Sequence, residues 1–166
     1  MKKTLILMLS IFAILNLTAQ ITEEQKEEIL NQHNYYRQLQ GAANLVWSDK
    51  LQSEAQQWAN YIAKKDIMAH SKMEYGENIY MSTANVSAKR PVDAWASEEQ
   101  YYNGETISHQ NYTLFGHYTQ LIWSETTQVG CAYAISKTGK YYWVCEYYPS
   151  GNFIGQKPVK NYQKNK

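Results

Sequence analysis

Residues 129–147 read VGCAYAISKTGKYYWVCEY, and this stretch contains the clearest strand pattern in the chain. Alternate positions from Val129 to Ile135, and again from Tyr141 to Tyr147, carry apolar or aromatic side chains. This period of two is typical of β-strands. Residues 136–140, which include Gly139, lie between the two runs and are typical of a turn. The sequence therefore predicts an antiparallel hairpin.

The two cysteines of the chain, Cys131 and Cys145, lie one on each strand of this hairpin. A hairpin folded symmetrically about Thr138 places them opposite each other. Directly opposed residues of an antiparallel pair have the Cα spacing that a disulfide needs. The spacing matches neither a Cys-x-x-Cys redox pair nor a zinc finger. We therefore predict a cross-strand disulfide; the alternative is two free cysteines in the core of the sheet.

Helical patterns precede the hairpin along the chain. The first two helices have clear start signals, a capping box formed by Thr22 with Gln25 and an N-cap at Ser48. Helices that come first and antiparallel strands that come late favour an α+β layered domain over a parallel βαβ fold. The expected elements are a helix from Thr22 to about Gln40, a helix from Ser48 to about Lys65, a short strand at 78–81, a helix from Pro91 to Gly104 and one or two helical turns within 116–123.

The first 19 residues have the three-part pattern of a secretory signal peptide. Lys2 and Lys3 are followed by an apolar run from Leu5 to Leu17 and by a small residue, Ala19. The apolar run is too short to cross a bilayer. We expect cleavage after Ala19, an exported protein that is secreted or periplasmic, and no integral membrane segment in the mature chain, residues 20–166. The alternative is an uncleaved N-terminal anchor.

The charge balance of the chain excludes one class of partner. The net charge is +1, and removing Lys2 and Lys3 leaves 14 basic against 15 acidic residues, a net charge of −1. Nucleic-acid binding requires a concentrated positive field that displaces counterions, and no basic stripe is present before the short C-terminal tail. We expect no nucleic-acid partner.

Four ionisable residues are the candidates for chemistry: His70, Glu77, Glu98 and His117. None of them has a spacing that is diagnostic alone. The chain has no His-Glu-x-x-His stretch and no Gly-x-Ser-x-Gly nucleophile elbow. Each of the four, taken singly, is more often an ordinary hydrogen-bonded or exposed residue.

Six blocks of sequence resemble the CAP superfamily, the cysteine-rich secretory, antigen 5 and pathogenesis-related proteins that share the SCP domain. They occur in the family's order from about residue 23 to residue 155. Together they are specific, although each alone is weak. The blocks are His33–Arg37 (HNYYR), Leu45–Trp47 with the apolar face of the second helix, Gly76–Ile79 (GENI), Trp95 with Glu98 and Tyr102, Gly116–Trp123 (GHYTQLIW) and Val144–Asn152 (VCEYYPSGN).

The resemblance implies a three-layer α-β-α sandwich with a central antiparallel sheet. It also implies a cleft in which His70, Glu77, Glu98 and His117 converge. The family's Trp-x-x-Glu spacing selects Glu98 rather than Glu99. The cysteines match one family disulfide, while the other family cysteines and the cysteine-rich C-terminal extension are missing, so functions that reside in that extension are not expected.

The four residues of this tetrad leave three functions open. The first is a secreted binding module that holds a divalent metal such as zinc on His70 and His117, with the carboxylates orienting the imidazoles or acting through water. Relatives are reported to bind sterols or fatty acids, so a lipid or sterol ligand is included. The second is a metal-dependent hydrolase or peptidase, which we consider the lesser expectation because hydrolytic zinc usually has three protein ligands. The third is a non-catalytic extracellular scaffold.

The aromatic residues, 15 Tyr and five Trp, are mostly expected in the core. All five Trp lie in the blocks above or on apolar faces of helices and strands. In the first helix, Ile29, Tyr36 and Leu39 mark the expected buried face. The residues expected to flank the cleft as ligand contacts are Tyr101, Tyr102, Tyr112 and Tyr118.

Overall fold

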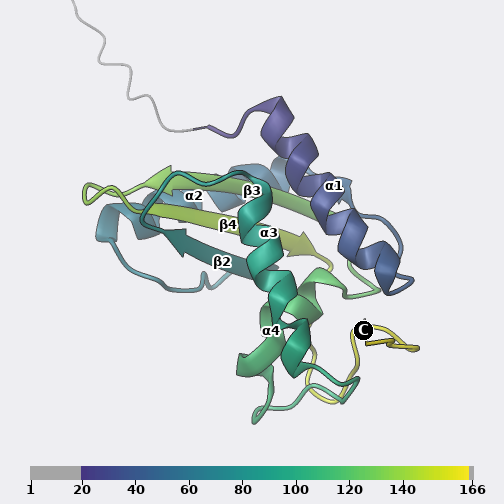
Figure 1. Cartoon of the computed structure of the whole chain (residues 1–166). Coiled ribbons are helices and arrows are strands. Elements are labelled where there is room, and N and C mark those ends of the chain that lie inside the picture. Colours follow the sequence, from purple (N-terminus) through teal and green to yellow (C-terminus); the bar gives the residue numbers. More distant parts are fainter. Residues whose placement is uncertain (1–19, 165–166) are drawn as a thin grey trace, which may run out of the picture.

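The computed structural model describes residues 20–164 and has three layers (Figure 1). Helix α2 covers one face of the sheet, and α1, α3 and α4 cover the other, as the α-β-α sandwich requires. The elements are, in order, α1 (Glu23–Leu39), β1 (Val46–Trp47), α2 (Asp49–Lys65), β2 (Gly76–Ser82), α3 (Lys89–Ala96), the 3-10 helix η1 (Ser97–Tyr101), α4 (Tyr112–Leu121), β3 (Gln128–Ile135) and β4 (Tyr141–Tyr148).

The four strands form one sheet in the order β1-β3-β4-β2. Strand β4 pairs antiparallel with both β2 and β3, whereas the two-residue β1 pairs parallel with β3. The expected hairpin is confirmed, with Cys131 directly opposite Cys145 and a disulfide joining them. Gly139 has a φ of +84° in the turn, a conformation that glycine adopts without strain.

The start signals of the first two helices are confirmed. Thr22 and Gln25 form a reciprocal capping box at α1, and the Ser48 side chain accepts a hydrogen bond from the Leu51 backbone at α2. These side chains satisfy backbone N–H groups that have no partner within the helix.

Two expected boundaries were wrong. The helix expected from Pro91 to Gly104 is α3 followed by the tighter η1, because the winding changes at Ser97, whose hydroxyl donates back to the Ala94 carbonyl. The helical turns expected within 116–123 begin earlier, at Tyr112, and α4 is kinked at Phe115, whose φ is −146°.

The buried face of α1 also differs from the expectation. Leu39 is exposed, and the buried residues are Ile29, His33 and Arg37, which are spaced by four and share one helical face. Of the expected residues, Ile29 is buried and Tyr36 is partly buried against the core, so only Leu39 was wrong. Hydropathy alone missed the two polar residues of the buried face. They are buried because each has specific hydrogen-bond partners.

Arg37 links α1 to the C-terminal end of α4 and to the residues that follow it. Its guanidinium donates to four backbone carbonyl oxygens, those of Ala43, Leu121, Trp123 and Thr126, at 2.7–3.0 Å. Burial lowers the pKa of Arg37 to about 10, so the group keeps its charge at neutral pH. One side chain therefore fixes α1 to the segment between α4 and β3.

Between residues 20 and 164, no helix is long and apolar enough to span a bilayer. The expected signal peptide, residues 1–19, lies outside the described part of the chain.

We predict that Arg37→Lys lowers the free energy of unfolding by about 2–4 kcal/mol, because lysine cannot reach four carbonyls and leaves buried acceptors unsatisfied. Urea unfolding at pH 7 measures the change. Arg90→Lys is the matched control, since Arg90 is exposed and should change stability by less than about 0.5 kcal/mol. Equal small effects of the two variants would contradict the role assigned to Arg37.

Candidate functional site

The first pair of the tetrad is formed by His70 and Glu77. Nδ1 of His70 contacts Oε1 of Glu77, and the Ser71 backbone N–H donates to both carboxylate oxygens at 3.0 and 3.2 Å. The side chain of His70 is 64% exposed, whereas that of Glu77 is 5% exposed. The hydrogen bond to Glu77 raises the pKa of His70 against the opposing effect of burial, and the carboxylate charge adds to the rise.

The second pair is formed by His117 and Glu98. Nδ1 of His117 lies 2.6 Å from Oε1 of Glu98, and Oε2 accepts from the backbone N–H groups of His117 and Tyr118 at 3.0 and 3.3 Å. The kink at Phe115 interrupts α4 just before these groups. Glu98, projecting from η1, therefore caps a helical segment and orients an imidazole with the same carboxylate.

Both pairs contribute to one solvent-reachable cleft of about 670 Å³. His70, Glu77 and His117 line it, and Glu98 lies behind His117. The opposite wall is held to α4 by Asn152, which accepts from the Thr119 hydroxyl and donates to the Gly116 carbonyl, both at 2.7 Å. The other lining residues are Asn78, His109, Tyr112, Thr113, Gly116 and Ile154.

In each pair, the carboxylate fixes one nitrogen of the imidazole. A carboxylate only accepts hydrogen bonds, so Nδ1 must carry the proton. Nε2 of each neutral ring then keeps a free lone pair, which is the state required of a metal ligand or a proton acceptor. The site thus has two oriented imidazoles in one cleft.

His33 belongs to a different, buried network that ends at the cleft. Its Nδ1 donates to the Ile29 carbonyl, and its Nε2 accepts from the Tyr147 hydroxyl, both at 2.8 Å. Asn78 donates to that hydroxyl and to the His117 backbone carbonyl. A continuous set of hydrogen bonds therefore joins α1 to the backbone of His117.

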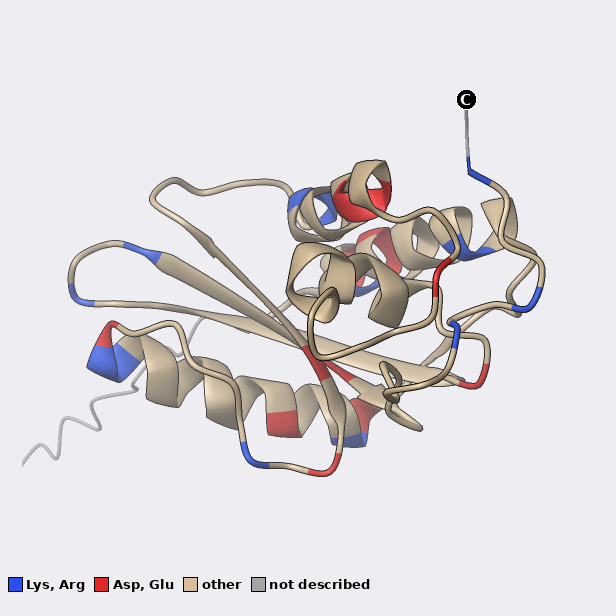
Figure 2. Cartoon of the chain, turned by 90° about the horizontal axis from the view of Figure 1, so that it is seen from below, with Lys and Arg blue, Asp and Glu red and all other residues tan. Residues whose placement is uncertain are grey.

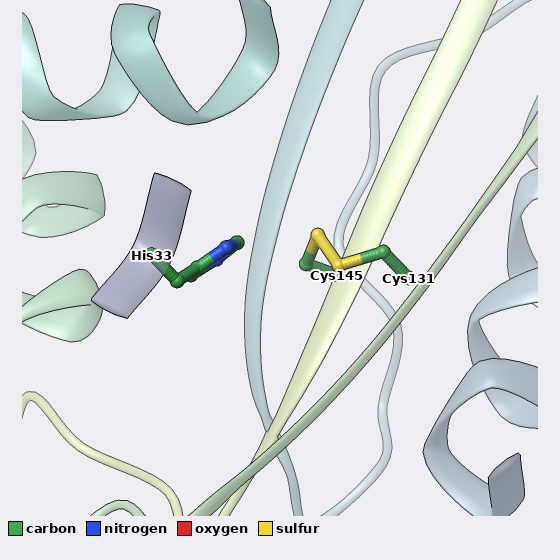
Figure 3. A group of neighbouring side chains, drawn as sticks. All are labelled: His33, Cys131 and Cys145. Atoms are coloured by element: carbon green, nitrogen blue, oxygen red, sulfur yellow. A yellow bond between two sulfur atoms is a disulfide. The ribbon is translucent and has the colours of Figure 1, made fainter. Parts of the chain in front are cut away.

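The His33 ring also faces the disulfide, as Figure 3 shows. Within residues 20–164, His33 with Cys131 and Cys145 is the only group of three or more His, Cys, Asp or Glu whose ligand atoms all lie within 4.8 Å of one another. Both sulfurs are bonded to each other, so this group offers no thiolate to a metal. It also follows that no three tetrad ligand atoms are that close together.

The expectations for the aromatic residues were only partly right. Trp95, Trp123 and Trp143 are buried, while Trp47 and Trp58 are partly buried. Tyr112 lines the cleft, but Tyr102 and Tyr118 are fully buried core residues, and Tyr101 is exposed outside the cleft lining. The last three were misassigned because neighbours of a site residue along a helix point in different directions, so nearness in sequence does not place a side chain in the cleft.

The family profile that describes cysteine-rich secretory proteins, CAP, matches residues 30–147. The chain belongs to the CAP family. Pathogenesis-related protein 1C of Nicotiana tabacum is 33% identical to this CAP protein over 137 residues, which are 82% of each sequence. Pathogenesis-related protein PR-1 of Medicago truncatula is 38% identical over 135 residues, covering 80% of this chain and 78% of the relative.

Solved structures share the CAP fold at lower sequence identity. A crystal structure of NaASP2 with Zn²⁺ superposes with a TM-score of 0.69 and 23% identity, covering 87% of this chain and 88% of the other. A crystal structure of Na-ASP-1 gives 0.74 and 22%, covering 87% of this chain and 43% of the other. These likenesses support the three-layer CAP architecture.

We predict that His33 makes this CAP protein sensitive to acid. Burial lowers the pKa of His33 to about 4. The unfolded chain, with a histidine pKa near 6.5, therefore binds more protons than the folded chain between these values, and stability falls as the pH drops from 6.5 to 4. The fully buried group should contribute a loss of about 3 kcal/mol over this window.

His33→Gln keeps one donor and one acceptor but cannot be protonated. Urea unfolding at pH 7.5, 5.5 and 4.5 should therefore show a shallower loss of stability in this variant than in the wild type. Parallel pH profiles for the two proteins would contradict the prediction, whatever the absolute stability of the variant.

Proposed function

We propose that this chain is an exported CAP-domain binding module whose cleft holds a divalent cation, such as Zn²⁺, on the Nε2 atoms of His70 and His117. The single observation that supports it most is that both imidazoles line one open cleft with Nδ1 occupied by a carboxylate. Carboxylate–imidazole pairs of this kind orient histidine ligands and increase their basicity.

The donor set fits a weakly held, exchangeable ion. Two neutral imidazoles are good zinc ligands, but a structural zinc site has four protein ligands and a catalytic one usually has three. A zinc ion held by two imidazoles would complete its coordination with water or with a ligand from solution and would polarise that ligand as a Lewis acid. NaASP2, which shares this fold, has a crystal structure with Zn²⁺.

A non-enzymatic role is the simpler reading of these residues. Ser71, the hydroxyl nearest to His70 in sequence, accepts a hydrogen bond from the Met73 backbone and is not paired with an imidazole. A metal-dependent hydrolase would need a further ligand or a general base beyond the two orienting carboxylates. The hydrolase remains the alternative, and an unbiased substrate screen of the wild type against Glu98→Ala distinguishes the two.

Export is part of the proposal. It is supported by the charged, apolar and small-residue pattern of the first 19 residues. The family, described as cysteine-rich secretory proteins, agrees with it.

A lipid or sterol is the second ligand class that we propose for this cleft. Tyr112 and Ile154 line it and are about half exposed, and Leu114 and Phe153, within two residues of them in sequence, are exposed to a similar degree. Exposed apolar side chains around a cleft favour an apolar ligand.

We predict that wild-type protein binds Zn²⁺ at pH 7.5 and that His70→Gln and His117→Gln each weaken the binding by at least about 10-fold, because each removes one of two ligands. Isothermal titration calorimetry measures the affinities. His109→Gln is the matched control, since His109 lines the same cleft but makes no hydrogen bond within residues 20–164. A control effect as large as that of the tetrad variants would exclude the assigned ligands.

The same titration at pH 5.5 should give weaker binding, because ligation requires neutral imidazole. Equal affinity at the two pH values would rule out imidazole ligation.

We predict that Ile154→Ser lowers the affinity for a fluorescent fatty acid or sterol by about 3-fold or more, because it removes apolar contact area. Fluorescence titration measures the change, and Ile67→Ser, at an exposed position outside the cleft lining, is the control. Unchanged binding by Ile154→Ser would place the apolar ligand elsewhere.

A further inference from the structure

Glu146 is a carboxyl group sealed inside the protein directly below the site. It lies in the middle strand β4 and is 0% exposed. Neither of its oxygens has a hydrogen-bond donor within reach among the described residues. A carboxylate in this position would be an uncompensated buried charge, which is one of the most unfavourable arrangements in a protein.

The side chain opposite Glu146 is another acid. The register of β2 with β4 pairs Glu77 with Glu146, so both point to the face covered by α2. Figure 2 shows Asp and Glu positions of the sheet in red. Glu54, on α2, is the next charged group that acts on Glu146. Both of these charged groups, the ones that act on the pKa of Glu146 within residues 20–164, are negative.

Helix α2 closes this position to water. On the β3 side, the partner of Glu146 is Gly130, which has no side chain. A Cβ atom at Gly130 would lie only 2.2–2.6 Å from backbone atoms of Ser48, Leu51 and Gln52. The first turn of α2 therefore rests directly on the strand beside Glu146 and leaves no room for a solvating side chain.

Protonation of Glu146 removes this buried charge. The protonated carboxyl group then needs a hydrogen-bond acceptor, and Glu77 is the acceptor that faces it. Burial, followed by the charge and hydrogen bonding of Glu77 and by the charge of Glu54, raises the pKa of Glu146 to about 9. A bound metal ion would compensate the charge less well, because the carboxylates of Glu54, Glu77 and Glu146 are not all within 4.8 Å of one another. The chemistry resembles that of other carboxyl pairs that share one proton.

We propose that Glu146 is a positioning residue, a buried carboxylic acid that donates a hydrogen bond to Glu77 and holds Glu77 against Nδ1 of His70. Glu77 then receives donors from three sides: Glu146 from inside, the Ser71 N–H from the loop and His70 from the cleft. This arrangement keeps the proton of neutral His70 on Nδ1 and leaves Nε2 free toward the cleft. Its relevance to cation binding rests on the proposed function, whereas the positioning itself does not.

The protonation of Glu146 can be observed directly in the wild-type protein. We expect the side-chain carboxyl ¹³C resonance of Glu146, assigned by comparison with Glu146→Gln, to have the shift of a neutral acid at pH 7. A resonance with the shift of an ionised carboxylate at pH 7 would overturn the proposal. This measurement does not depend on the folding of any variant other than the conservative one.

The positioning role is tested by the tautomer of His70, read from its ¹⁵N shifts. Glu146→Gln keeps a neutral donor and should leave both the Nδ1–H tautomer and the pKa of His70 unchanged. Glu146→Met removes the donor at similar volume and should at least double the population of the Nε2–H tautomer. Glu54→Gln, which removes the other nearby charge but not the donor, is the matched control and should resemble the wild type.

Two results would overturn the positioning role. One is a fall in the pKa of His70 in Glu146→Gln, which an ionised Glu146 would cause. The other is an unchanged tautomer ratio in folded Glu146→Met. If Glu146→Met does not fold, the wild-type carboxyl shift and the pKa of His70 in Glu146→Gln still decide.

Zinc titration of the same variants separates this inference from the proposed function. We expect Glu146→Met to bind Zn²⁺ several-fold more weakly and Glu146→Gln to bind it as the wild type does. If the wild type binds no Zn²⁺, the proposed function fails while the tautomer measurement stands. If His117→Gln weakens binding and Glu146→Met does not alter the tautomer, the proposed function stands and the positioning role fails.

Discussion

The register of the middle strand β4 is the constraint on which the rest of the structure depends. Because β4 pairs with both β2 and β3, each of its residues has a fixed neighbour on two sides. On the face covered by α1, Cys145 meets Cys131 and Tyr147 reaches His33 and Asn78; on the face covered by α2, Glu146 meets Glu77. A shift by one residue would exchange the two faces of the strand and separate all of these partners. The disulfide, which joins directly opposed residues, locks this register covalently.

The two carboxylate–imidazole pairs of the cleft are supported from different layers of the fold. His70 and Glu77 are seven residues apart, and Glu77 is held by the strand β2 on the α2 side of the sheet. His117 and Glu98 come from α4 and η1 on the opposite side, and the buried network of Asn78, Tyr147 and His33 connects to the backbone of His117. The cleft lies where these layers meet, so its geometry depends on how the layers of the domain pack together. A binding site built this way is preorganised, which lowers the entropic cost of ordering it when a ligand binds.

Much of the fold could be predicted because it is encoded in local patterns. The capping box at Thr22, the N-cap at Ser48 and the alternation of the hairpin each act within a few residues of the chain. The buried face of α1 could not be predicted in this way. Arg37 is buried because four carbonyl oxygens from distant segments converge on it, and no local hydropathy pattern records such partners. The split of the third helix into α3 and η1 was missed for a different reason: the hydrogen bond from the Ser97 hydroxyl to the Ala94 carbonyl is local, but serine occurs in helices with and without such a bond.

By itself, the sequence determined the family, the layered α+β class and the hairpin with its disulfide, and it predicted the four tetrad residues, because ordered motifs and periodic patterns can be read without coordinates. Only the tertiary structure decided how those residues meet: that Glu98 is the partner of His117, that Tyr102 and Tyr118 are core residues, and that Glu146 lies sealed behind Glu77. The physical reason is that the burial and electrostatic environment of a side chain depend on residues that are distant in sequence and close only in the folded structure. Glu146 looks like any other glutamate in the chain until α2, Gly130 and β2 enclose it and deprive it of every donor.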